Sequence, residues 1–280
     1  MYLYSTGVLT VAGYALVNLF RESYEELDVL IPFKALSTAT LIAPGANEII
    51  ITKMGQLSPI DPSVQHALGP IVQMPGQPRG RIAPVNLENV NAFIQLAKKE
   101  LGLDQENSMM NILQMLASKI NPLVLGAVHR SREEIAFLAS TLIQYHTNDN
   151  ERIENCVKIL TRHRFSHECI VSRREAREVL GLNIVEPDED LTALVVGLFD
   201  AYNDRIMVDK PYHPEVILAG EEVRVADLNR AIIESIDLSH VFRTRREIKR
   251  VEVAQPGISH PVVAHQERLL EEGWVERDTI

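Results

Sequence analysis

The sequence predicts an α/β protein in which a parallel β-α-β core over residues 1–85 is followed by a mainly helical region over residues 86–205. Short apolar runs, typical of strands buried on both faces, alternate with helical patterns in the first part of the chain. In the second part, apolar residues recur at intervals of three and four, which indicates successive helices. Residues 206–280 are predicted to be a C-terminal extension, whose structure the pattern leaves open.

The elements of the first part follow one another as strand and helix. Since parallel neighbours need crossover connections, this order indicates a parallel sheet with right-handed crossovers. The predicted elements are a strand at 2–6, a helix at 10–26, a strand at 28–33, a short helix at 37–46 and a strand at 48–52. Pro44 is expected to keep the second helix short or kinked, because its ring would clash with the carbonyl of Thr40. A Pro- and Gly-rich loop is expected at 74–84.

Later segments show helical stripes and two β-prone runs. Ser172 and Glu175 have the spacing of a capping box that opens a short helix. The predicted helices are 86–102, 108–119, a helix after Pro122 that includes Ile143, 153–160, 172–181 and 188–203. Strands are expected at 223–236 and 241–253, and Trp274 is expected to anchor a terminal helix. The basic residues between 243 and 250 are interpreted as a solvated face.

Composition excludes several function classes. The 28 Lys and Arg residues against 38 Asp and Glu residues give a net charge of −10. Because nucleic-acid binding depends on clustered basic charge, no nucleic-acid partner is expected. Cys156 and Cys169 are the only cysteines, which fits a reducing, cytoplasmic location. The longest apolar-rich stretch, 8–20, is shorter than the ~20 residues that a bilayer requires, so no membrane span is expected. No metal or cofactor is expected either.

Two predicted strand ends carry the candidate chemistry. Sites in parallel sheets form at the carboxyl ends of strands, and Gly7 and Ser37 both lie at such ends. A serine there is exposed, and the N–H groups of a glycine turn and of Thr38 could together bind a developing oxyanion. The alternative is that Ser37 only caps the following helix through its side-chain oxygen.

A longer motif surrounds this serine. Residues 32–63 read PFKALSTATLIAPGANEIIITKMGQLSPIDPS. This stretch resembles the nucleophile-to-acid segment of the serine dehydrogenase proteinase family, within the ClpP/crotonase superfamily. The segments NPLVLGAVHRS (121–131) and FSHECIVSRREAREVLGL (165–182) are also similar to that family, and the resemblance covers roughly residues 1–205.

The resemblance implies a ClpP/crotonase-like core and a serine peptidase mechanism. Ser37 would be the nucleophile, and the Gly7-Val8 turn with the Thr38 N–H would bind the oxyanion. Superfamily relatives use either His with Asp or Lys as the base. The candidates for the base are Lys34, Asp61 and His66, with His167 farther along the chain. The partners implied are a peptide or protein substrate and further copies of this chain.

Some positions depart from the family pattern. Val8 stands where the family has glycine, Thr38 stands where it has a small alanine, and the N-terminal strands of the superfamily core are expected to be missing. These departures leave two alternatives to a peptidase open. One is a catalytically degenerate scaffold or assembly protein. The other is an acyl-thioester binder, because oxyanion holes of this fold also bind thioesters.

Overall fold

The structure is a computed structural model that describes residues 1–7, 9–60, 63–73, 80–161, 169–253 and 261–277. It is a mixed α/β protein with small sheets, some of them parallel. The chain divides into two compact units, Met1–Thr192 (unit 1) and Ala193–Ile280 (unit 2). The boundary falls within helix α8 (Glu189–Ile206). Among the described residues, no helix has both the length and the apolar character that a membrane crossing requires.

A parallel sheet lies at the centre of unit 1. β1 (Asp28–Ile31) pairs in parallel with β3 (Glu48–Ile51), and β10 (Ile184–Val185) pairs in parallel along the other side of β3. On the outer side of β1, the N-terminal segment forms a parallel bridge between Tyr2 and Leu30. The structure therefore confirms the two predicted apolar strands, whereas only bridges form in the predicted strand 2–6.

Unit 1 also contains a second, separate three-stranded sheet. β2 (Lys34–Ala35) runs parallel to β4 (Gln56–Leu57), and β9 (Val171–Ser172) joins β4 in antiparallel orientation. A parallel bridge between Ser5 and Ala35 adds the N-terminal segment to the outer side of β2. Because β2 and β4 are parallel, the residues that follow them meet at the same edge of this sheet.

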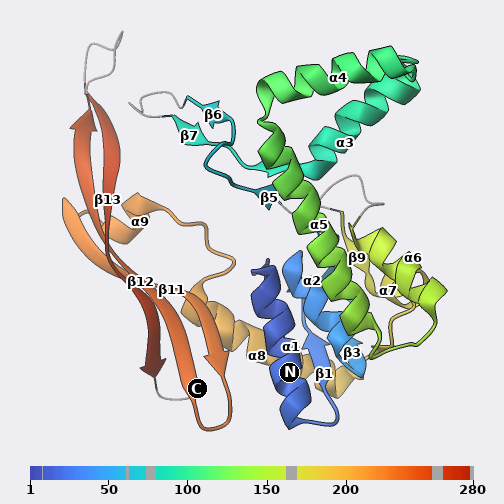
Figure 1. The fold of residues 1–280 in the computed structure, drawn as a ribbon. Helices are drawn as coiled ribbons and strands as arrows, with labels where there is room; N and C mark the ends of the chain where they lie inside the picture. Colours follow the sequence, from blue (N-terminus) through green and yellow to red (C-terminus); the bar gives the residue numbers. More distant parts are fainter. Residues whose placement is uncertain (8, 61–62, 74–79, 162–168, 254–260, 278–280) are drawn as a thin grey trace. The chain divides into compact units, whose positions relative to one another are not determined.

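Helices cover the parallel sheet and complete its core (Figure 1). The helices that contribute are α1 (Thr10–Ser23), α2 (Thr38–Ile42), α5 (Pro122–Ile143) and α6 (Asn150–Thr161). Alternate strand residues are fully buried between these layers: Val29, Ile31, Ile49 and Ile51. Burial of each such side chain contributes about 1.5–3 kcal/mol, so this layer provides much of the stability of unit 1.

Helix α2 is short, as Pro44 predicts. The α-helix ends at Ile42, and a 3₁₀ turn, η1 (Ala43–Gly45), follows it. Gly45 packs directly on α1, because a Cβ at this position would lie 2.4 Å from Cγ1 of Val17. The guanidinium of Arg21 then donates to the carbonyl oxygen of Gly45 from both Nε (3.0 Å) and Nη2 (2.8 Å). These contacts fix the end of η1 against α1.

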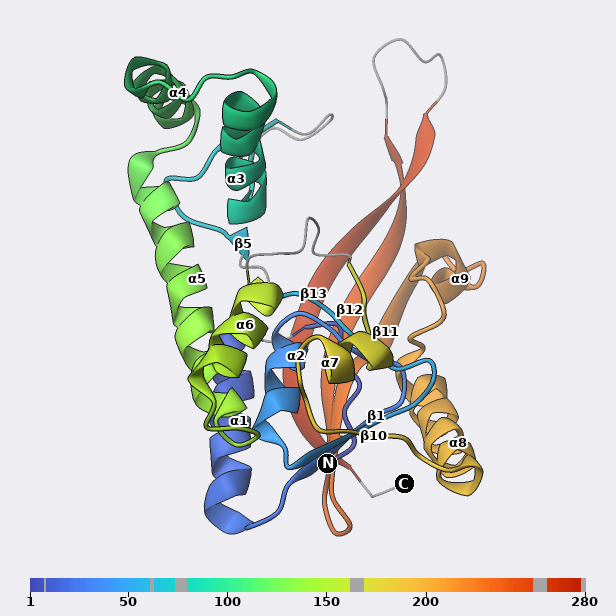
Figure 2. The same ribbon diagram turned by 90° about the vertical axis from the view of Figure 1, so that its right-hand side faces the viewer.

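The remaining part of unit 1 extends from one end of α5 (Figure 2). Its helices are α3 (Leu87–Gln95), the π-helical turn η2 (Leu96–Glu100) and α4 (Glu106–Lys119). Two short antiparallel pairs precede them: β5 (Ser63–Val64) with β8 (Val85–Asn86), and β6 (Ile71–Val72) with β7 (Arg81–Ile82). The end of the predicted loop is thus partly strand, and residues 74–79 lie outside the described residues.

A capping box opens α7 (Arg173–Glu178), as the sequence predicts. The Ser172 hydroxyl accepts from the Glu175 N–H, and the Glu175 carboxylate accepts from the Ser172 N–H at 3.0 Å. The two residues thereby satisfy donors that the first helical turn leaves without partners.

Replacement of Ser172 by alanine is expected to lower the free energy of unfolding by about 1 kcal/mol, because the cap is lost. Urea titration measures the change. Ser118→Ala, on the exposed surface of α4, is the control and is expected to change stability little. Equal effects of the two substitutions would contradict the assignment of the cap.

Unit 2 is built on a long antiparallel sheet. Its strands follow in chain order as β11 (Val223–Glu234), β12 (Ser239–Val253) and β13 (Val262–Arg277), and the short helix α9 (Pro214–Leu218) packs against β11 and β12. The two predicted strands are confirmed. The prediction for Trp274 was wrong: this residue lies on β13, where its ring meets Phe242 edge to face at 5.4 Å.

The basic residues of β12 are paired within this sheet. Arg243 and Arg246 lie near Glu271 and Glu267 of β13, and Arg245 lies near Asp227 of β11. The cross-strand register places Arg245 directly opposite both Asp227 and Glu271, which favours the pairing of these strands. Arg245 and Lys249 are exposed, so the run has a solvated face and also contributes ion pairs to the sheet.

Candidate active site

Ser37 lies in a strained turn between β2 and α2. Its backbone has φ 54° and ψ −127°, a conformation that glycine adopts freely and that a residue with a Cβ adopts only under strain. Its side chain makes no capping hydrogen bond to the helix. The interpretation of Ser37 as a side-chain cap was therefore wrong. Strain of this kind costs about 1–3 kcal/mol and tends to occur at functional sites.

The Ser37 hydroxyl has no hydrogen-bond partner among the described residues, and the residue is half-buried. Gly7 lies directly beside it: a Cβ on Gly7 would be 3.5 Å from Cβ and 3.9 Å from Oγ of Ser37. Gly7 itself has φ 143°, which favours glycine at this position. The N-terminal segment thus brings a residue without a side chain next to the serine hydroxyl.

Two of the predicted oxyanion donors are in the described part of the chain. The Thr38 N–H has no acceptor among the described residues, because Thr38 is the first residue of α2. The Gly7 N–H donates to Oγ of Ser5 at 3.1 Å, so in this structure it does not point to an open space. Val8, the third predicted donor, lies outside the described residues.

The Thr38 side chain turns toward α1. It is 6% exposed, and its Oγ1 lies 3.5 Å from Oγ1 of Thr10. The Thr38 hydroxyl is therefore directed at the neighbouring helix α1, where it lies beside the hydroxyl of Thr10.

The candidate bases differ in exposure and in hydrogen bonding. Lys34 is exposed on β2, three residues before Ser37. His66 is half-buried, and its Nδ1 accepts from the Leu68 N–H at 3.1 Å. Within the described ranges, no hydrogen bond joins Lys34 or His66 to Ser37. Asp61 and His167 lie outside the described residues.

Sequence reasoning missed one residue of this site, Ser58. It follows β4 directly, and its Oγ accepts from the backbone N–H of Ser37 at 2.6 Å. Ser58 is 3% exposed, so this is a buried contact. The signal that could have found it is the parallel pairing of β2 and β4, which brings the residues after both strands together.

Cys156 is excluded as a rival nucleophile. It is fully buried in the core of unit 1, and this burial raises the pKa of its thiol to about 12. Since the thiolate is the reactive form, this cysteine is inert at neutral pH.

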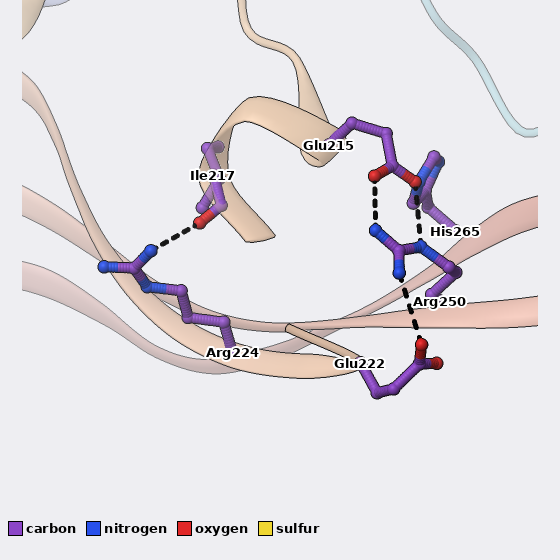
Figure 3. Close-up of polar contacts among 6 residues, drawn as sticks. All are labelled: Glu215, Ile217, Glu222, Arg224, Arg250 and His265. Atoms are coloured by element: carbon purple, nitrogen blue, oxygen red, sulfur yellow. Dashed lines mark hydrogen bonds and ion pairs between the residues drawn. The ribbon is translucent and has the colours of Figure 1, made fainter. Parts of the chain in front are cut away.

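A dense cluster of charged side chains lies in unit 2 (Figure 3). Arg250 of β12 donates through Nε (3.1 Å) and Nη2 (2.6 Å) to the carboxylate of Glu215 on α9, and through Nη1 to Glu222. Nε2 of His265 lies 2.7 Å from the same Glu215 carboxylate. Arg224 of β11 donates to the carbonyl oxygen of Ile217. Every group in the cluster has a partner, and together they hold α9 on the sheet.

This cluster predicts an acid-sensitive unit 2. Hydrogen bonds from Arg250 and then from His265 lower the pKa of Glu215 from 4.5 to about 2. A carboxyl group whose pKa is lowered in the folded state stabilises that state above its unfolded pKa, and the contribution is lost as pH falls from about 4.5 toward 2. Thermal unfolding of unit 2 between pH 6 and pH 2 measures this, with Glu215→Gln expected to flatten the dependence. An identical pH profile in the variant would contradict this role.

Among the described residues, no group of three or more His, Cys, Asp or Glu side chains is arranged to hold a metal ion. Comparison of the chain with protein-family models, with curated proteins and with solved structures finds no match. The residues around Ser37 are therefore the candidate functional site of this chain.

Proposed function

We propose that this protein is a serine peptidase of the type that the Ser37 segment resembles, with Ser37 as its nucleophile. The observation that carries the proposal is the strained turn between the end of a strand and the start of a helix, where the Ser37 hydroxyl has no hydrogen-bond partner in the described part of the chain. Hydrolases present their nucleophilic serine on turns of this kind, because the sharp bend exposes Oγ above the sheet edge.

The proposed reaction is acyl transfer in two steps. Oγ of Ser37 attacks the carbonyl carbon of a peptide bond, a base accepts the hydroxyl proton, and the amine leaves with a proton to give an acyl-enzyme. Water then attacks the ester and releases the acid, which regenerates the Ser37 hydroxyl. The Thr38 N–H and the turn at Gly7-Val8 would bind the oxyanion in both steps.

The base is proposed to be one of Lys34, Asp61 and His66. The three residue types titrate in different ranges, so the pH dependence of the rate separates them. We expect the rate of hydrolysis to fall strongly in one of three single variants: Lys34→Met, Asp61→Asn or His66→Gln. In that variant, the ascending limb of the pH–rate profile should also be lost.

Hydrolysis assays test the proposal. The purified protein is incubated with an unfolded protein substrate and with activated esters, and new N-termini and released acid are measured. Cleavage by the wild type and none by Ser37→Ala support the proposal. Equal rates for the two proteins, or no hydrolysis of any substrate by the wild type, contradict it.

One observation favours a second candidate, a scaffold that has lost catalysis. The Gly7 N–H is already bonded to Ser5, which leaves the Thr38 N–H as the oxyanion donor among the described residues. A stable homo-oligomer by light scattering, together with no reaction at Ser37, would favour this candidate. The peptidase proposal also expects a homo-oligomer, so the reaction at Ser37 is the result that distinguishes them.

A further inference from the structure

We propose that Ser58 is a positioning residue, whose hydroxyl holds the backbone of Ser37 in the conformation that presents the nucleophile. The inference rests on the proposed function and adds to it a residue that the sequence motif does not single out as functional. It is carried by the buried hydrogen bonds around Ser58.

The direction of the Ser58 hydroxyl is fixed by its partners. A hydroxyl has one proton to donate and two lone pairs to accept with. The Ser58 Oγ donates to the carbonyl oxygen of Pro59 at 3.1 Å and accepts from the Ser37 N–H at 2.6 Å. The proton is thus directed at Pro59, and a lone pair is directed at Ser37.

Ser58 is itself held in place by Thr40. The Ser58 N–H donates to Oγ1 of Thr40 at 3.0 Å, and this hydroxyl donates to the carbonyl oxygen of Ala35 at 2.7 Å. Thr40 is fully buried. The chain of bonds starts at the end of β2, passes through α2 to the end of β4, and returns to the turn at Ser37.

The contact has a specific effect at Ser37. Ser37 has a positive φ and is half-buried. If the Ser58 hydroxyl were removed, the Ser37 N–H would lose its acceptor, and an unpaired donor in such a position is unfavourable. Removal of the Ser58 hydroxyl therefore favours relaxation of the turn toward ordinary backbone angles. A shift of about 1 Å in a reacting group lowers a rate by about 10²-fold, so we expect a loss of about 10- to 100-fold.

A merely structural role would give a different result. Thr52→Val removes the hydrogen bonds of another buried hydroxyl in unit 1, because Oγ1 of Thr52 donates to the carbonyl oxygen of Pro32 and accepts from the Met54 N–H. It is the matched control, because it should lower stability by an amount similar to Ser58→Ala without touching the bonds around Ser37 and Ser58. Ser58→Thr keeps the hydroxyl and should restore the function of the alanine variant.

The experiment measures two quantities in the full-length wild type and in the three variants. The first is the rate of covalent labelling by a fluorophosphonate, and the second is hydrogen exchange at the Ser37 amide by NMR. Ser58→Ala is expected to be labelled about 10- to 100-fold more slowly and to lose about 10-fold or more of the exchange protection. Thr52→Val and Ser58→Thr should stay within about 3-fold of the wild type in labelling rate, a change below 1 kcal/mol.

Two results would overturn the inference. One is a labelling rate in Ser58→Ala equal to that of the wild type; the other is an equal loss in Thr52→Val, which would make the effect a consequence of stability. Absence of labelling in the wild type is a separate result, because it overturns the proposed function and with it any catalytic role of Ser58. In that case, exchange at the Ser37 amide still shows whether the hydrogen bond holds the turn.

Discussion

Replacement of Ser37 by alanine is expected to lower the rate of hydrolysis by about 10³-fold or more, because removal of a nucleophile leaves only the contribution of binding and oxyanion contacts. The substitution removes one hydroxyl that has no partner among the described residues, so no hydrogen bond of the described fold is lost. Stability is therefore expected to stay within about 0.5 kcal/mol of the wild type.

The measurement is the steady-state rate with an activated ester, combined with urea unfolding of the same preparation. Ser63→Ala is the control, since Ser63 is an exposed serine on β5 whose φ is not positive. Retention of more than about one tenth of the wild-type rate in Ser37→Ala would contradict the assignment of the nucleophile.

Replacement of Ser37 by glycine is expected to increase stability while it abolishes hydrolysis. Glycine relieves strain of about 1–3 kcal/mol at φ 54°, ψ −127°, whereas its greater freedom in the unfolded chain costs about 0.5–1 kcal/mol. The net result is a stabilisation of up to about 2.5 kcal/mol relative to Ser37→Ala, which keeps the Cβ and therefore the strain.

Ala219→Gly is the matched control for this prediction. Ala219 has φ 49° in the turn after α9, and glycine there should also relieve strain, but without any effect on hydrolysis. If Ser37→Gly proves less stable than Ser37→Ala by urea unfolding, the turn stores no strain, and the observation that carries the proposed function loses its physical basis.

Local patterns in the sequence predict the α-helices of unit 1 and its two four-residue strands, but not its two-residue strands. The apolar runs give β1 and β3, Pro44 explains the short α2, and Ser172 with Glu175 gives the start of α7. Each of these depends on residues close together in the chain. β10 was not predicted, because a strand of two residues has no pattern of its own and forms only by pairing with β3.

Long-range pairing explains what the sequence could not show in unit 2. Trp274 lies on a strand because β13 pairs with β12 along its length, and the basic residues of β12 meet acidic residues of its neighbours in that register. Register is a property of two segments that are distant in the chain. A basic run, considered alone, therefore gives no indication of its partners.

The sequence predicted part of the candidate site, and the rest is visible only in the structure. The motif around Ser37 identified the serine, and the strand-to-helix position predicted a turn there. The approach of Gly7 and Ser58 depends on the N-terminal segment and β4 lying alongside β2, and only the structure gives the donor–acceptor relations among them.

Mass spectrometry of the protein after treatment with a fluorophosphonate shows whether Ser37 is a nucleophile. We expect one adduct per chain, located at Ser37 in the peptide map, and none in Ser37→Ala. An unmodified wild-type protein, or an adduct on another residue that persists in Ser37→Ala, would contradict it.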